Sequence, residues 1–317
     1  MSDSRMHLVD KNLPGPRREY VGYGRHRPQV VWPNKAKVAV NFVINYEEGS
    51  EYSFSAGDTR NVGWFELYAR DSMSQRDLYA ESVFEYGSRA GIWRLMRIFD
   101  DYSIPITFYA CAVALERNPE VGAWIKESKH EACSHGWRLA EQWTLTPEQE
   151  REQMGWAIEM IKEQCGERPY GWYSGMQPSA FTRELLVEEG GFVYDSDSYA
   201  DDLPYFVKVH GKDHLVVPYT SLVYNDARFI ATQGYSTGAD FFDICRRALD
   251  EYHREGEAGT PCMMSIGLHG RWCGHAGRAS ALREFIEYAQ AKGDVWFARR
   301  IDIARHWLAH HSEFQSS

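Results

Sequence analysis

From Lys37 onward, the chain repeats one pattern: a short apolar run rich in β-branched residues is followed by a segment with the apolar spacing of an amphipathic helix. Roughly seven such strand–helix units follow one another, with no linker or shift in composition between them. This order predicts an α/β fold with a parallel sheet covered by helices, and one continuous array favours a single barrel. The active site of such a barrel lies at the carboxyl ends of its strands. Strands are expected at residues 38–45, 105–115, 192–194, 215–219, 263–268 and 295–297.

The beginning of the chain does not share this pattern. Residues 1–36 are rich in Pro, Gly, Arg and Tyr and show no helical or strand period. We expect them to form an arm over the barrel or over a partner subunit, and residues 37–317 to form the barrel domain. Within that domain, Thr146 and Gln149 have the spacing of a capping box at the start of a helix.

Composition limits the partners of such a barrel. The chain holds 35 Lys and Arg against 45 Asp and Glu, a formal net charge of -10, whereas nucleic acids and anionic membranes are bound through clustered positive charge. The amino-terminal segment has no signal-peptide core, and no stretch approaches the about 18 apolar residues of a membrane span. The six cysteines include no C-x-x-C pair and are expected to be reduced thiols. We therefore expect a soluble, cytoplasmic protein.

Titratable side chains follow three of the expected strands. Glu47 and Glu48 come directly after the first strand; their repulsion at a barrel mouth can raise one pKa toward that of a useful base, and a solvated pair on a surface turn is the equally weighted alternative. His135 follows a later strand, and His269 ends the strand at 263–268, where it suits a general acid. A zinc site of the H-x-x-x-H type would need a second histidine at position 139, which is Leu. The metal signal is therefore incomplete.

Other polar or aromatic side chains occupy two further strand ends. Trp172 and Tyr173 follow one of them, and Asp195 follows the strand at 192–194. For Trp172 and Tyr173 the alternative is ordinary strand-end packing, which for Trp172 alone is the better interpretation. For the acidic segment around Asp195 the alternative is a solvated loop. Taken together with Glu47-Glu48, His135 and His269, the order of these residues along the chain carries more information than any one of them.

In this order the segments resemble the motifs of the polysaccharide deacetylase superfamily (carbohydrate esterase family four), whose fold is an irregular (β/α)7 barrel. In that family the first motif has paired aspartates, one the base and the other a metal ligand. The second motif has two metal-binding histidines four residues apart, the third carries Arg-x-Pro, and the last carries Leu-x-His with the acid. In this chain those places are taken by Glu47-Glu48, His135, Arg168-Pro169 and Leu268-His269.

The departures from these motifs are informative. Glutamates replace the aspartates, and Leu139 stands where the second metal histidine would be. In both respects the chain resembles the cofactor-independent allantoinase branch of the superfamily, which is similar to bacterial cyclic-imide hydrolases. The resemblance runs from Val38 to Trp307 through the segments NYEEG, EYGSRAG, RNPEV, CSHGWR, GWYSG, EEGGFVYDSDSY, DDLPY, VPYT, SIGLH and VWFARR.

The resemblance implies a hydrolase that opens a ring C–N bond of an imide or hydantoin without a metal ion. Glu47 would be the general base on water, and His269 would protonate the leaving nitrogen. His135 and Glu48 would position that water or hold the developing oxyanion. If a metal were bound, it would be one divalent, zinc-like ion with Glu48 and His135 as ligands.

The ring itself would be held by residues from several loops. Trp172 and Tyr173 would clamp it, and Arg89 or Asp195 would orient its polar edge. Two loops at the mouth depart from the allantoinase pattern. The loop after Gly175 offers no fixed cation for a ureido substituent, and the loop after His269 offers bulky or apolar residues, so we expect simple imides to be better substrates than allantoin. The departing residues are Met176, Gln177 and Trp272.

Two alternatives stay open. A metal-dependent polysaccharide or peptidoglycan N-deacetylase would need a third metal ligand that the sequence does not offer. A catalytically inactive binding protein on this fold would not need the polar residues at five strand ends. On the favoured interpretation, the ligand is a small cyclic ureide or imide from purine or pyrimidine catabolism, and the protein is a homo-oligomer, either a dimer or a tetramer.

Overall fold

The computed structural model describes residues 13–62, 74–220, 223–230 and 234–314. In this part of the chain nine strands form one sheet in the order β6-β7-β5-β4-β3-β2-β1-β8, with β9 paired to β1. The pairs are parallel except for the antiparallel pair β6–β7. The strands are β1 Val38–Tyr46, β2 Thr107–Ala110, β3 Glu131–Ser134, β4 Gly171–Trp172, β5 Tyr194–Asp195, β6 Tyr205–Val209, β7 Lys212–Val216, β8 Cys262–His269 and β9 Val295–Phe297.

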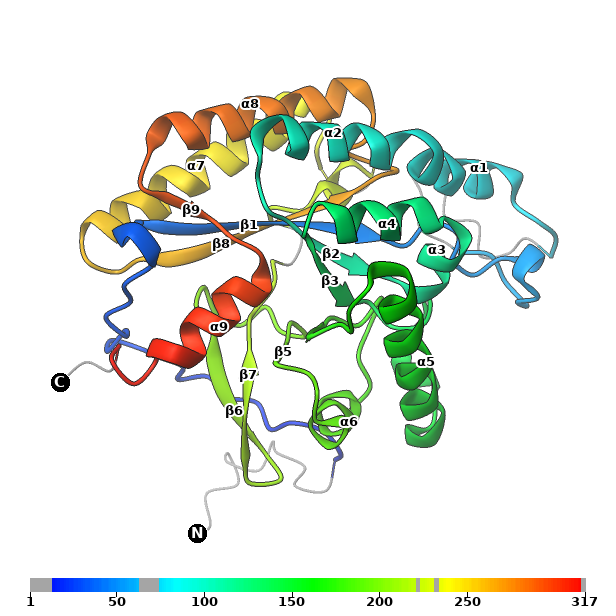
Figure 1. Ribbon diagram of the computed structural model, residues 1–317, viewed down its shortest axis with the longest axis horizontal. Helices are drawn as coiled ribbons and strands as arrows, with labels where there is room; N and C mark the ends of the chain where they lie inside the picture. Colours follow the sequence, from blue (N-terminus) through cyan, green and yellow to red (C-terminus); the bar gives the residue numbers. More distant parts are fainter. Residues whose placement is uncertain (1–12, 63–73, 221–222, 231–233, 315–317) are drawn as a thin grey trace, which may run out of the picture.

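Helices cover the outer face of this sheet, and α2, α7 and α8 lie together over β1 and β8 (Figure 1). The predicted α/β barrel is therefore confirmed, and the predicted capping box opens α5. The helices are α1 Leu78–Tyr86, α2 Ile92–Tyr102, α3 Ala112–Arg117, α4 Pro119–Glu127, α5 Pro147–Cys165, α6 Thr182–Glu189, α7 Gly238–Glu257, α8 Ala276–Lys292 and α9 Arg300–His310, with a π-helical turn at Gly87–Gly91.

One local prediction was wrong, and one unit departs from the general strand–helix pattern. The strand expected at 105–115 ends at Ala110, and its second half forms α3, because AVALER is composed largely of good helix formers. No helix separates β5 from β7; instead β6 and β7 form a hairpin. The two residues of its turn, His210 and Gly211, both have positive φ (48° and 80°), as the twist of a two-residue hairpin requires.

The sheet divides the core into an outer and an inner part, because successive side chains of a strand point to opposite faces. On β1, Val40, Phe42 and Ile44 belong to the apolar cluster that includes α2 and α8. Ala39 and Val43 belong to a second cluster, which fills the barrel interior. The same alternation determines which side chains at the strand ends reach the barrel mouth.

In the described part of the chain, no strand pairing joins β7 to β8 to close the barrel. A buried arginine lies in the barrel interior. Arg300, the first residue of α9, is fully buried. Its guanidinium lies over the rings of Tyr109 and Tyr219. It donates to five oxygens drawn from β1, β8 and the segments after β5 and β7: Asn41 Oδ1, Ser196 Oγ, Val217 O, Pro218 O and Ser265 Oγ.

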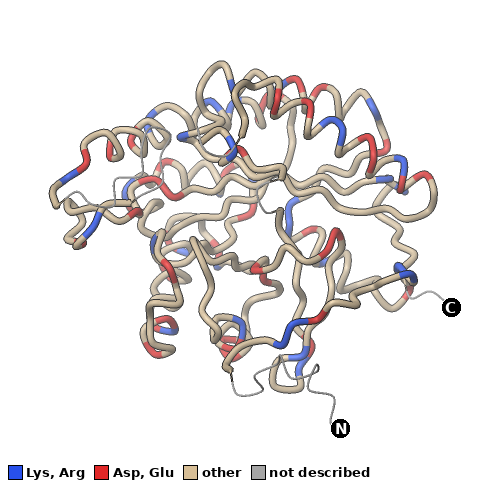
Figure 2. The backbone as a smooth tube through the Cα atoms, turned by 180° about the vertical axis from the view of Figure 1, so that it is seen from behind, with Lys and Arg blue, Asp and Glu red and all other residues tan. Residues whose placement is uncertain are grey.

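The described part of the amino-terminal arm packs against the barrel; residues 1–12 lie outside the described ranges. Trp32 Nε1 donates to the carbonyl of Cys262 at 3.1 Å, and the Tyr23 hydroxyl donates to that of Pro204 at 2.6 Å. Basic and acidic positions are interleaved along the outer helices (Figure 2). None of the described helices has the length and apolar character needed to cross a membrane.

Candidate active site

The alternation of β1 sends the adjacent glutamates in opposite directions. Glu47 continues the inward row of the strand and reaches the barrel mouth. Glu48 continues the outward row and lies under the π-helical turn, where a Cβ on Gly87 would come within 2.4 Å of Glu48 Oε1. Gly91 in the same turn is equally constrained, since its Cβ would lie 1.9 Å from the Gly270 carbonyl oxygen. The glycines of this turn therefore allow close packing over Glu48.

Glu47 is surrounded by three nitrogen-bearing side chains. Its Oε1 atom lies 3.2 Å from His135 Nε2 and 3.8 Å from His269 Nε2. Its Oε2 atom accepts a hydrogen bond from Arg271 Nη2 at 2.5 Å. All four residues are buried. Three of the four predicted catalytic residues thus meet around one carboxylate.

The other ring nitrogen of each histidine is held by an oxygen acceptor. His135 Nδ1 donates to the Tyr173 carbonyl at 2.7 Å, and His269 Nδ1 donates to Asp226 Oδ1 at 2.6 Å. Because these bonds place a proton on Nδ1 of both rings, Nε2, which faces Glu47, is the nitrogen of each ring that is available for proton exchange.

Asp226 was missed by sequence reasoning. It lies in a 3-10 turn, Asp226–Phe229, outside any strand, and its carboxylate Oδ2 also accepts the backbone N–H groups of His269 and Cys273. A single parallel bridge between Asn225 and Gly267 brings this turn alongside β8. Only glycine permits that approach, because a Cβ at position 267 would lie 2.5 Å from Asn225 Nδ2.

The surroundings separate the two glutamates electrostatically. Burial alone would raise the pKa of Glu47, but Arg271, His269 and His135 more than offset it and hold the pKa well below its usual range. Burial raises the pKa of Glu48 above its usual value, although Arg271 opposes the shift. The raised pKa expected from carboxylate repulsion therefore belongs to Glu48, and the carboxylate that faces the histidines is the ionised one.

Known proteins resemble this chain in sequence over most of its length. The family model described as "Polysaccharide deacetylase" matches residues 75–176. A protein of Schizosaccharomyces pombe named "Putative polysaccharide deacetylase" is 36% identical over 303 residues, which are 88% of this chain and 93% of that protein. This chain belongs to the polysaccharide deacetylase family.

Two solved structures extend the comparison. A "probable Polysaccharide deacetylase from Pseudomonas aeruginosa PAO1" has a TM-score of 0.89 at 45% identity, covering 93% of this chain and 99% of the other. A structure described as "Puue Allantoinase" has a TM-score of 0.88 at 44% identity, covering 96% and 99%. This member of the polysaccharide deacetylase family thus has a hydrolase fold shared by proteins named for two different reactions.

The donor set of this family member does not suit a divalent ion. Among the described residues, no three His, Cys, Asp or Glu side chains are grouped so that they could hold a metal. Glu48 and His135, the expected ligand pair if a metal were bound, have other partners: Glu48 Oε2 accepts the Glu47 N–H, and His135 lies between Glu47 and the Tyr173 carbonyl. Leu139, at the place of the second metal histidine, is buried in the apolar core.

Trp172 and Asp195 do not lie at the mouth, so their predicted contacts with the ring were wrong. The two residues are register partners on neighbouring strands and share the outward face. Trp172 packs against Phe192 in the outer core. Asp195 Oδ2 accepts a hydrogen bond from Arg183 Nε at 2.7 Å and lies 2.9 Å from His214 Nε2. Each residue is one position out of phase with the inward row.

The prediction for Arg89 was also wrong. Its side chain extends from the π-helical turn with 80% of its surface exposed and pairs with Glu85 at 3.8 Å. Because Gly87 and Gly91 are the residues of that turn that approach the site, Arg89 points away from it.

Tyr173 and Trp272 flank the two histidines. The Tyr173 ring stacks on His135 with centroids 5.2 Å apart, and Trp272 lies 4.2 Å from the His269 ring. Met176 is half-buried against the core. The Gln177 side chain is exposed, and the backbone carbonyl of this residue accepts a hydrogen bond from the Gln142 N–H.

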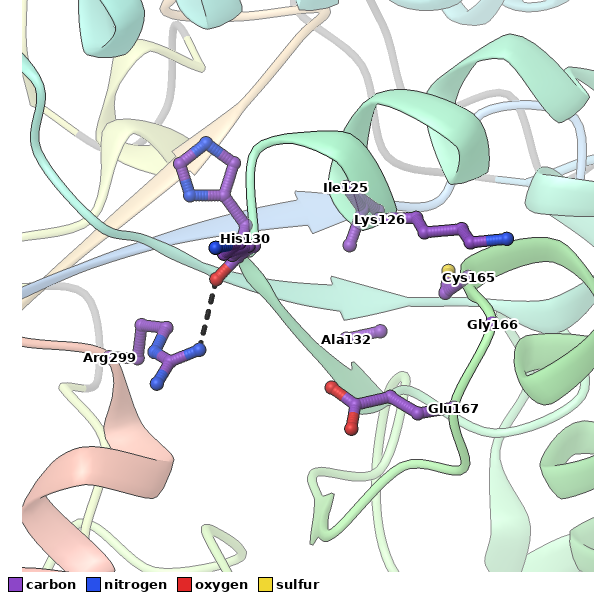
Figure 3. Close-up of a pocket in the computed structure, with 9 residues that line it drawn as sticks. Ile125, Lys126, His130, Ala132, Cys165, Gly166, Glu167 and Arg299 are labelled. Atoms are coloured by element: carbon purple, nitrogen blue, oxygen red, sulfur yellow. Dashed lines mark hydrogen bonds between the residues drawn. The ribbon is translucent and has the colours of Figure 1, made fainter.

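A cavity of about 260 Å³ lies at the opposite end of the barrel (Figure 3). It is bounded by residues that precede β3, β4 and α9, among them His130 and Arg299, which donates to the Lys129 carbonyl. Burial lowers the pKa of His130 to about 4. The cavity is remote from Glu47, which follows the carboxyl end of β1.

The carboxylates after β5 yield a prediction about stability. Asp197 is partly buried beside Asp195 and accepts the N–H and hydroxyl of Ser174 at 2.9 and 2.8 Å. Burial and the Asp195 charge raise the pKa of Asp197 from 3.8 to about 7. The folded protein therefore keeps a proton that the unfolded chain has lost, so this residue makes the free energy of unfolding fall as the pH rises from about 4 to about 7.

Asp197→Asn is expected to remove that fall. Urea unfolding of both proteins at pH 4 to 8 measures it: the wild-type free energy minus that of the variant should decrease across this window. Asp213→Asn, at an exposed position paired with Lys208, is the control. Parallel curves for wild type and Asp197→Asn would contradict the prediction.

Proposed function

We propose that this family member hydrolyses the C–N bond of a cyclic amide, an imide or a hydantoin-like ureide, without a metal ion. The observation that carries the proposal is the environment of Glu47: one oxygen faces two histidine Nε2 atoms and the other is held by Arg271. The likeness over almost the whole chain to a structure described as "Puue Allantoinase" supports the same substrate class.

The residues can be given roles in this reaction. Glu47 Oε1 takes a proton from water, whose oxygen attacks the ring carbonyl carbon. His269, as the imidazolium, gives its Nε2 proton to the ring nitrogen as the C–N bond breaks, and Asp226 stabilises this charge and holds the histidine with Nε2 toward the site. Glu47 then passes the proton that it took from water to His269 Nε2, 3.8 Å away, which restores the acid. His135 holds Glu47 and the water in place.

The substrate class fits a site without a metal. The negative charge that develops on the ring nitrogen of an imide or hydantoin is delocalised, so this nitrogen is a good leaving group, and the ring carbonyl is already activated. A metal ion that polarises a carbonyl and activates water supplies several kcal/mol, and an activated ring needs less of that help. An N-acetyl group, whose leaving group is a basic amine, needs more.

The test is ring opening after exhaustive chelation. Purified protein is expected to open succinimide, dihydrouracil, hydantoin or allantoin after dialysis against chelator, with simple imides favoured over allantoin by about tenfold to a hundredfold in kcat/KM. Loss of activity that zinc restores, or release of acetate from N-acetylated oligosaccharides, would favour a metal-dependent deacetylase instead. No turnover of any substrate would favour a binding protein.

A further inference from the structure

We propose that Arg271 is the resident cation of this site: its guanidinium neutralises the adjacent glutamates and fixes Glu47 with Oε1 toward the two histidines. The inference deepens the proposed function, on which it rests only for the naming of Glu47 as the base. Arg271 acts through Glu47, and it is therefore a positioning residue.

The contacts of Arg271 reach both carboxylates. Its Nη2 donates to Glu47 Oε2 at 2.5 Å, and its Nη1 lies 3.6 Å from Glu48 Oε1. The backbone N–H of the same residue donates to Glu48 Oε1 at 3.3 Å. One residue thus links the inward and the outward glutamate, which the alternation of β1 sends to opposite faces.

The guanidinium is held in place by apolar rings. Arg271 is 3% exposed, and its Cζ lies 4.1 Å from the Trp272 ring centroid and 4.6 Å from that of Phe84. Within the described structure its Nε and Nη1 atoms have no hydrogen-bond partner. A buried donor without a partner is costly. The position of this arginine is therefore explained by its ion pairs with the carboxylates and not by a complete set of hydrogen bonds.

A fixed positive charge here also explains why the donor set does not suit a metal. A divalent ion beside Glu47 would lie within a few ångströms of the guanidinium, and like charges in a buried site repel strongly. The other titratable groups around Glu47 come from every neighbouring element: Glu48 and Glu51 on its own loop, Cys111 after β2, His135 after β3, His269 of β8, and Asp226 behind His269.

The first experiment needs no substrate. Protein carrying ¹³C in the glutamate carboxyl groups is titrated by NMR, and the Glu47 signal is assigned by its loss in Glu47→Gln. In Arg271→Met its titration midpoint is expected to rise by at least about one pH unit, and in Arg271→Lys by less. The control is Arg183→Met, which removes an arginine–carboxylate pair on the outer face and should leave the Glu47 signal unchanged.

The second experiment uses any ring substrate that the protein opens. Arg271→Met is expected to lose about tenfold to a hundredfold in kcat/KM, with the acid limb of its pH profile moved upward and with partial rescue by millimolar guanidinium but not by zinc. A folded Arg271→Met with the wild-type Glu47 titration, or stoichiometric metal in the wild-type protein, would overturn the inference. If no ring is opened but the NMR shift appears, the proposed function fails and Arg271 keeps its role.

Discussion

Glu47→Gln is expected to lower kcat for ring opening by roughly 10²–10⁴-fold, the usual contribution of a general base. The amide is nearly isosteric with the acid and can still accept a hydrogen bond from Arg271, but it cannot take a proton from water. Because Glu47 is the ionised member of the pair, its charge and not its shape is what the substitution removes. Steady-state kinetics with the best ring substrate measures the loss, and urea unfolding checks the fold.

A matched control lies four residues along the chain. Glu51 is also buried, and burial raises its pKa, but its carboxylate accepts the Gly49 N–H and does not face the histidines. Glu51→Gln should keep kcat within about threefold of wild type, the range of an ordinary conservative change. Equal losses in the two variants, or none in Glu47→Gln, would show that Glu47 is not the base.

Asp226→Asn is expected to lower kcat by a comparable factor, on the order of 10²–10⁴, because it reverses the tautomer of His269. An amide cannot accept from Nδ1 of the histidine and from the two backbone N–H groups that now share the Asp226 carboxylate. Turning its NH₂ group toward Nδ1 leaves the ring neutral with its one proton on Nε2, so His269 can no longer be the imidazolium that gives up the Nε2 proton and keeps the one on Nδ1. The ¹⁵N chemical shifts of the His269 ring report this change directly.

The outer face supplies the control for Asp226. Asp195 also binds a histidine, His214, at 2.9 Å and is fully buried. Asp195→Asn should lower the free energy of unfolding while leaving kcat and the His269 ring shifts as in the wild type. An Asp226→Asn protein with normal kcat would remove His269 as the proton donor.

The sequence was sufficient to predict β1 and β8, which precede Glu47 and end at His269, since each contains a short buried run of apolar residues. It also supplied Glu47, His135 and His269. The failures at Trp172 and Asp195 have a simple cause: only every second residue of a strand faces inward, and both lie on the outer row. Counting from the inward Tyr173 and Tyr194 would have excluded them.

Asp226 and Arg271 could not be found in that way. Asp226 follows a hairpin and reaches His269 only because one bridge joins Asn225 to Gly267 of β8. Arg271 stands two residues beyond the end of the inward row, in a loop shaped by close contacts among glycines. Both positions depend on tertiary packing between segments far apart in the sequence.

The buried Arg300 ties the order of synthesis to completion of the barrel. Asn41, on β1, accepts a hydrogen bond from a residue 259 positions later. Until α9 is made, the polar oxygens that line the interior have only water as a donor, and the tyrosines below His135 have no cation beneath them. A chain that ends before residue 300 therefore lacks the donor that completes the barrel interior.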